Sequence, residues 1–137
     1  YDVSNKASVK LLTAQQTPGR CTHNTWLSND KKYLFTTDEV ENAAIGAYDI
    51  SNLNDIKELD QFRRVETLNR GVVPHNVHVK NDYLVTSYYT DGVNIIDATD
   101  PSNLIEVGHY DTYPGADGGF NGAWGVYPYF PSGTIVV

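Results

Sequence analysis

Apolar residues occur along the chain in short runs rich in valine, isoleucine, tyrosine and threonine, and no segment carries a long apolar stripe of helical period. Four such runs follow one another in the middle of the sequence, and each is typical of a β-strand. They read HNVHVK (75–80), DYLVTSYYT (82–90), GVNIIDAT (92–99) and LIEVGHY (104–110). The pattern predicts an all-β protein.

Turn residues separate these runs. Asp91 and Gly92 stand between the second and third runs, where a tight two-residue hairpin turn needs positive φ. The segment DATDPSN separates the third and fourth runs, and Pro101 fixes φ there. We therefore expect the four runs to form one four-stranded antiparallel sheet.

Both faces of the predicted strands are apolar. Leu84 is followed directly by Val85, and Ile95 by Ile96, although neighbouring residues of a strand point to opposite faces. In a sheet with one solvent-exposed face, each strand would alternate strictly between apolar and polar residues. The pattern therefore favours sheets that are stacked against neighbours on both sides.

Two sequence elements recur along the chain. The first is YDVSNKASVKLL from Tyr1, which returns as YDISNLNDIKEL from Tyr48 and as IDATDPSNLIEV from Ile96, at spacings of 47 and 48 residues. The second begins with His-Asn, at His23 and again at His75. Two elements that interleave at one period indicate a repeat architecture.

A third copy of the His-Asn element is NGAWGVYPYFPSGTIVV, which starts at Asn121. In this alignment Asn121 takes the position of the histidine, and Trp124 is in phase with Trp26 and His78. We expect the two tryptophans to pack between repeated units; the alternative is that they stack on a sugar.

A four-stranded unit that repeats every 40 to 50 residues or so predicts a β-propeller of four-stranded antiparallel blades. The expected boundaries are the second half of a blade at 1–15, blades at 20–66 and 72–113, and the first half of a blade at 120–137. This amounts to about three blades, whereas propellers typically have about four to eight. We expect the chain to be part of a larger propeller.

Composition excludes several classes of partner and site. The net charge is −7 and the pI is near 4.8, which argues against nucleic acid and anionic membranes, because both attract basic surfaces. Cys21 is the only cysteine, so there is no internal disulfide and no cysteine-based zinc site. No apolar run approaches the roughly 18 residues of a membrane span. The sequence carries no Met and no signal peptide, so we expect a processed or partial chain.

Several motifs resemble a known family. YLVTSYYTDGVNIIDATDPSNLIEVGHYDT resembles the LVIVD repeat of bacterial propellers. CTHNTWLSNDKKYLFTTDE, PHNVHVK and YDTYPGADGGFNGAWGVYPYFPSGTIVV together resemble the propeller region of choice-of-anchor B proteins, although Asn24 stands where that family usually has Gln, and Gly125 where it has Ser. The resemblance covers nearly the whole chain. It implies a secreted or cell-surface bacterial propeller, but no activity and no catalytic residues.

The His-Asn pairs are expected to open the first strand of each blade, which lines the central channel. The end of the second strand lies on the same face, so Asp38 and Glu39 should be close to His23 and His75. Such convergence is what a ligand site needs. The candidate ligand-binding residues of this channel face are His23, Asn24, His75, Asn76, His78, Asn121 and Trp124.

A divalent metal ion is one occupant that this face could take. The candidate ligands are His23, His75, Asp38 and Glu39. Imidazole with carboxylate suits zinc or manganese, whereas carboxylate and amide oxygens suit calcium. The alternatives are that the repeated polar residues tie neighbouring blades together through hydrogen bonds to the main chain, or that they contact a small molecule or glycan.

Two further motifs predict structural roles. Asp2, Asp49 and Asp97 each precede a Ser or Thr by two residues, and we expect them to cap turns on the face opposite the histidines rather than to bind calcium. The segment DQFRRVETLNRG (60–71) holds the only cluster of basic residues. We expect it to be an outer strand and its connection, solvated on one face.

These observations favour a non-catalytic binding or protein-interaction module at the bacterial cell surface, with a protein or glycan as partner. One alternative is a metal-assisted hydrolase that uses His23, His75 and Asp38 around one ion. Another is a structural subunit of a larger envelope assembly. No Gly-x-Ser-x-Gly motif is present, and nothing in the sequence orients Cys21 as a nucleophile, so neither a serine nor a thiol enzyme is expected.

Overall fold

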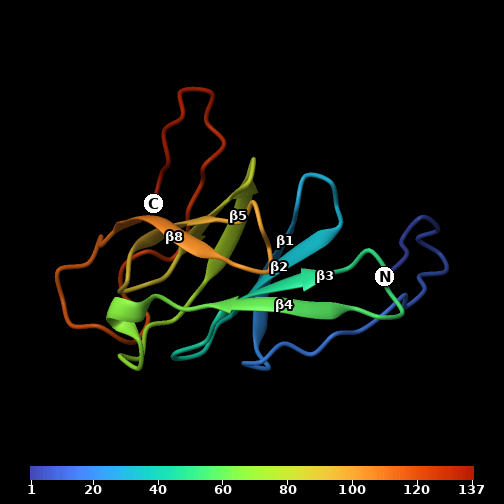
Figure 1. Ribbon diagram of the computed structural model, residues 1–137, viewed down its shortest axis with the longest axis horizontal. Coiled ribbons are helices and arrows are strands. Elements are labelled where there is room, and N and C mark those ends of the chain that lie inside the picture. The colour runs from blue at the N-terminus through green and yellow to red at the C-terminus, as the bar shows by residue number, and fades with distance from the viewer.

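Eight strands form two four-stranded antiparallel sheets in this computed structural model, which describes residues 1–137 (Figure 1). The strands of each sheet lie side by side in chain order. The first sheet contains β1 (Thr22–Leu27), β2 (Tyr33–Asp38), β3 (Ile45–Asp49) and β4 (Lys57–Phe62), and the second contains β5 (Asn76–Lys80), β6 (Tyr83–Ser87), β7 (Val93–Asp97) and β8 (Ile105–Tyr110). One short 3-10 helix, η1 (Val65–Thr67), connects them. The prediction of an all-β protein is confirmed.

The two sheets repeat each other in detail. The pairing of β3 with β4 shifts register between Ala47 and Tyr48, and the pairing of β7 with β8 shifts between Ile95 and Ile96, 48 residues later. The strands of the sheets fall inside the expected units 20–66 and 72–113. A bulge at the same place in both sheets gives their outer strands the same local twist.

The aspartates of the first repeated element cap turns, as predicted. Asp2, Asp49 and Asp97 each accept a hydrogen bond from the backbone amide two residues on, at 2.8–2.9 Å. Asp49 and Asp97 end β3 and β7, at the opposite end of the sheets from the first residues of β1 and β5. All three residues therefore hold turns, and Asp49 and Asp97 lie at the end of the sheets away from His23 and His75.

The main core lies between the sheets. β1 and β5, the first strand of each sheet, lie side by side. Leu84 is fully buried in this core, whereas Val85 belongs to a second cluster that packs against the C-terminal segment. The second sheet is therefore covered on both faces, as its sequence pattern predicts. The largest core side chains between the sheets are Phe35, Ile45, Phe62, Leu84, Tyr88 and Ile96.

Polar side chains also join the sheets. Each of them bonds a main-chain group across the interface, so buried amides and carbonyls there are satisfied. Asn24 Oδ1 accepts from the Val77 amide at 3.0 Å, Thr37 donates to the His75 carbonyl at 2.5 Å, Tyr88 donates to the Ala43 carbonyl at 3.1 Å, and Asp60 accepts from the Leu104 amide at 2.7 Å. The interface is tied along its inner and outer strands alike.

The prediction of a two-residue turn at Asp91 and Gly92 is wrong. β6 ends at Ser87 and β7 begins at Val93, so the loop has five residues, and the positive φ values fall on Tyr89 (43°) and Gly92 (73°). The loop is held by its side chains, because Tyr88 and Tyr89 are buried and both hydroxyls bond groups of the first sheet's loops. These anchors override the local preference for the shorter turn.

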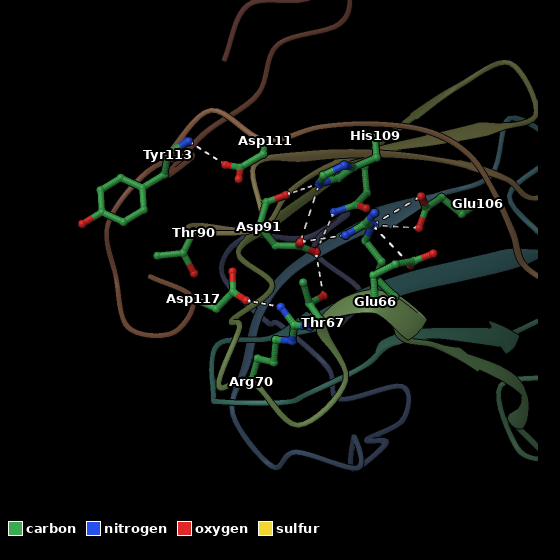
Figure 2. A network of polar contacts seen from close by, with 12 residues as sticks. Glu66, Thr67, Arg70, Thr90, Asp91, Glu106, His109, Asp111, Tyr113 and Asp117 are labelled. Carbon is green, nitrogen blue, oxygen red and sulfur yellow. Dashed lines mark hydrogen bonds and ion pairs between the residues drawn. The ribbon is translucent and has the colours of Figure 1, made fainter. Parts of the chain in front are cut away.

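Asp91 lies at the centre of a buried polar network (Figure 2). Its side chain is 3% exposed; it accepts a hydrogen bond from Thr67 Oγ1 at 3.2 Å and pairs with Arg64 Nη1 at 3.4 Å. His109 Nε2 lies 2.8 Å from the Asp91 carbonyl oxygen, and Arg64 also pairs with Glu106 at 3.2 Å. Burial raises the pKa of Asp91, and Arg64 and His109 oppose that rise. The network joins η1, the β6–β7 loop and β8.

The basic segment 60–71 forms the end of the outer strand β4 and the connection after it, as expected, but Arg64 does not lie on a solvated face. The Arg64 side chain is only 15% exposed, because it compensates the buried carboxylate of Asp91. Arg70, in contrast, is 61% exposed and pairs with Asp117 at 3.1 Å.

The two ends of the chain contain no strand of either sheet. The N-terminal segment has one isolated bridge, between Asp2 and Lys10. The C-terminal segment has one within itself, between Tyr127 and Val136, and one from Ala123 to Tyr89. Figure 1 shows the C-terminal segment, in red, projecting beyond the second sheet. The expected half blades at 1–15 and 120–137 stay a prediction. No helix in the structure is long and apolar enough to cross a membrane.

Replacing Arg64 tests the buried network. We expect Arg64→Met to lower the free energy of unfolding by about 3 kcal/mol at neutral pH, because it leaves the Asp91 carboxylate buried without its cation. The loss should shrink toward pH 4 or so, where protonation of Asp91 in the folded state removes the unpaired charge. Urea unfolding at the two pH values measures this. Arg70→Met is the control, with a loss below about 1 kcal/mol; equal losses for the two variants would contradict the assignment.

Candidate functional site

Three of the sequence-predicted residues meet at one end of the sheets. His23 lies near the start of β1, His75 immediately precedes β5, and Glu39 immediately follows β2. Antiparallel pairing of β1 with β2 brings Thr22 opposite Asp38, which places the start of β1 beside the residue after β2. The side-by-side packing of β1 and β5 then brings the second sheet's histidine to the same place.

The rings at this end form a column. His23 and His75 stack with centroids 4.1 Å apart and planes 27° apart, and Trp124 stacks on His75 at 5.3 Å and 29°. Tyr89 lies against His75 at 5.0 Å in a tilted geometry, and Phe120 meets Tyr89 edge-on. His75 is 2% exposed, whereas Trp124 is 69% exposed. The column therefore has a buried centre and an aromatic end that is open to solvent.

Glu39 binds to the column through three groups. Its Oε2 lies 3.3 Å from His23 Nδ1, and its Oε1 lies 3.6 Å from His75 Nε2. The Tyr89 hydroxyl donates a hydrogen bond to Oε1. Burial and the neighbouring carboxylate both raise the pKa of Tyr89, so the hydroxyl keeps its proton and acts as a donor.

His75 is oriented by the main chain. Its Nδ1 donates a hydrogen bond to the Trp124 carbonyl, because a carbonyl oxygen can only accept. Burial lowers the pKa of His75, and the neighbouring His23 lowers it further; the Trp124 carbonyl and Glu39 act in the opposite direction. The neutral ring then has its lone pair on Nε2, the atom that faces Glu39.

His23, Glu39 and His75 are the group that could hold a metal ion, since one ligand atom from each lies within 4.8 Å of the others. The fourth predicted ligand, Asp38, is not part of this group. Its two carboxylate oxygens accept hydrogen bonds from Thr17 Oγ1 at 2.5 Å and from the Gly19 amide at 2.7 Å. Asp38 therefore holds the segment that precedes β1.

The asparagines of the predicted face differ in role. Asn24 bonds the Val77 amide and so acts as an inter-sheet tie. Asn76 is half-buried and its side chain makes no hydrogen bond. Asn121 is exposed and likewise has no hydrogen-bonded side chain. Asn24 therefore ties the two sheets together, which is the structural role that the sequence offered as an alternative. Neither Asn76 nor Asn121 forms a hydrogen bond to the ring column.

The predicted phase of the third copy is wrong. Trp124, rather than Asn121, occupies the position of the histidine: Ser87 Oγ donates to the Trp124 carbonyl at 3.2 Å, as Thr37 Oγ1 donates to the His75 carbonyl one unit earlier. A bridge between Tyr89 and Ala123 fixes the position of this segment against the second sheet.

Trp26 and His78 belong to a second ring group, which Tyr129 completes. His78 lies 4.6 Å from Trp26, and Tyr129 lies 5.7 Å from both rings. Trp26 therefore packs between units, as expected. His78 Nδ1 is buried and has no hydrogen-bond partner, and burial lowers the pKa of this histidine.

Tyr89 and Phe120 are residues of the ring column that sequence reasoning missed. β2 starts at Tyr33 and β6 at Tyr83, so Tyr89 stands at the position of Glu39, 50 residues later. The rule that selected Glu39, the end of a second strand, also applies to Tyr89, but a tyrosine is not a usual metal ligand and was not singled out.

Comparisons of the chain with protein-family models, with curated proteins and with solved structures found no match.

We expect Asn24→Ala to lower the free energy of unfolding by about 1–3 kcal/mol, because it leaves the buried Val77 amide without a partner. Asn76→Ala, the same change one unit later, should cost less than about 1 kcal/mol because that side chain has no hydrogen bond. Chemical denaturation of the two variants makes the comparison, and similar losses would show that Asn24 is not an inter-sheet tie.

The second ring group predicts a pH dependence of stability. His78 holds a proton less readily in the folded state than its ordinary pKa of 6.5 would allow, so stability should fall as pH drops through that value. We expect His78→Phe, which keeps an aromatic ring against Trp26 and Tyr129, to lose less stability than the natural chain between about pH 8 and about pH 5. Melting temperatures across this range measure the effect; parallel curves for the two proteins would rule it out.

Proposed function

We propose that the chain is part of a β-propeller and that its function is to bind a ligand at the end of the sheets where the ring column lies. The observation that carries the proposal is the column itself: an exposed tryptophan stacks on the buried His75, His23 stacks on the other side of that ring, and a carboxylate lies beside both histidines. Flat apolar rings next to polar groups are typical of ligand sites.

Two features support the propeller. Consecutive sheets with the same strand order pack with their first strands side by side, which is how blades surround a channel. The face of the first sheet that points away from the second carries a hollow of about 240 Å³. It is lined by Leu34, Tyr48 and Ile50 among others, and by Thr13, Gln15 and Thr17 of the N-terminal segment. The apolar side chains of this face suit a further sheet. The LVIVD resemblance agrees with this reading.

The resemblance to choice-of-anchor B proteins supports a bacterial cell-surface location. At that location the partner is a glycan or a protein, and the geometry favours a glycan. Trp124 and Phe120 are 69% and 65% exposed, so ring faces are available to the apolar face of a sugar. Glu39 and His23 lie nearby to bond its hydroxyls. This proposal is one of non-catalytic binding.

A metal-assisted hydrolase is a second candidate, and only the His23–Glu39–His75 group favours it. Glu39 would take the role that the sequence suggested for Asp38, because Asp38 is bonded elsewhere. A structural subunit of an envelope assembly has no separate support in these contacts.

Glycan-array screening of the chain, with titration of any hit by tryptophan fluorescence, tests the proposal. We expect Trp124→Ala to weaken binding at least about 10-fold, or ~1.4 kcal/mol, because the stacking ring is lost. Tyr110→Ala is the control, since Tyr110 is equally exposed (70%) but lies on the outer strand β8. Absence of any glycan ligand, or equal effects of the two variants, would count against this function.

A further inference from the structure

We propose that His23, Glu39 and His75 bind a single zinc ion at the junction of the two sheets. The three side chains come from β1, from the residue after β2 and from the residue before β5, and their ligand atoms lie within 4.8 Å of one another. The proposal deepens the proposed function, because it concerns the same end of the sheets and rests on that end being a ligand site.

His75 is oriented for a metal ion. Its Nδ1 donates to the Trp124 carbonyl, so Nε2 is the ring atom left to bind a metal, and it lies 3.6 Å from Glu39 Oε1. A zinc ion between these two atoms would bind both. Metal-bound histidines have this arrangement, with the second ring nitrogen donating to a carbonyl or carboxylate.

Glu39 is oriented by a residue that is not itself a proposed ligand. The Tyr89 hydroxyl donates to Oε1, which fixes the carboxylate against both histidines. Oε2 lies 3.3 Å from His23 Nδ1. Two of the three ligands therefore already have the outer hydrogen bonds that orient ligands in metal sites. Side chains that only pack against one another do not require these orienting hydrogen bonds.

The ligand types select the ion. Two imidazoles and one carboxylate are a ligand set of zinc sites that keep one position open, whereas calcium takes six to eight oxygen ligands or so. Only Glu39 offers carboxylate oxygens here, since Asp38 is bonded to Thr17 and Gly19. The His23 side chain is 36% exposed, so the fourth position would be reached from solvent. A ligand atom from the proposed partner or a water molecule would occupy it.

Calorimetric titration of the chelator-treated chain with zinc chloride tests the site. We expect one zinc ion per chain. His23→Ala and Glu39→Gln each remove a metal ligand and should weaken zinc binding by more than about 100-fold, because loss of a hydrogen bond to a ligand already costs about 10–100-fold. Tyr89→Phe removes only the outer hydrogen bond and should cost about 10–100-fold. Circular dichroism checks that each variant is folded, and the exposed His23 makes its replacement the safer one.

Cys21→Ser is the matched control, because the exposed thiol lies two residues from His23 and could bind zinc by itself. We expect its affinity to equal that of the natural chain, and cobalt substitution should give a visible spectrum without a thiolate charge-transfer band. No binding, or binding that persists in both His23→Ala and Glu39→Gln, would overturn the proposal. Loss of binding in Cys21→Ser alone would overturn it too.

The result is separable from that of the glycan screen. Zinc titration uses no glycan, and the glycan screen can be run both with and without a chelator. Zinc binding without any glycan ligand would leave the metal site in place and remove the proposed function. Glycan binding that a chelator does not affect, together with no zinc binding, would do the reverse.

Discussion

The contact between β1 and β5 is the constraint on which the rest of the structure depends. β1 is largely exposed, so apolar burial alone does not fix its position against the second sheet. The hydrogen bond from the Val77 amide to Asn24 ties the two strands directly, since a buried amide without an acceptor is costly. In this docked arrangement His23 stacks on His75. The candidate site is therefore a product of sheet docking.

Much of the fold is predictable from the sequence because its signals are local. The strands of the second unit follow from apolar residues on both faces, and the turns that Asp49 and Asp97 cap follow from the reach of an aspartate side chain. The β6–β7 loop was not predictable, because Tyr88 and Tyr89 anchor it to residues more than forty positions away. Local turn propensity carries no information about contacts with such distant residues.

The burial of Arg64 shows the same limit. Its partner Asp91 is 27 residues away in the β6–β7 loop, so the sequence alone suggests a solvated cation. The register of the C-terminal segment was also missed. Glycines give no hydrophobic pattern that would fix the alignment. The hydrogen bond from Ser87 to the Trp124 carbonyl and the bridge between Tyr89 and Ala123 show that Trp124 takes the histidine position.

Of the candidate site, the sequence predicts which strand ends meet but not which side chains turn inward. Neighbouring residues at a strand end point to opposite sides, so Asp38 and Glu39 could not both join the histidines. The preceding loop takes Asp38, because Thr17 and Gly19 offer it two donors. That choice depends on loop geometry, which repeats and composition do not encode.

Glu39 and Tyr89 occupy the same position in successive units, and one donates a hydrogen bond to the other. Copies of an ancestral repeat would begin with identical residues at this position. Two glutamates would repel each other there, and two tyrosines would supply no charge to the histidines. The junction therefore requires that the copies differ, and once they differ, the units can no longer exchange places along the chain.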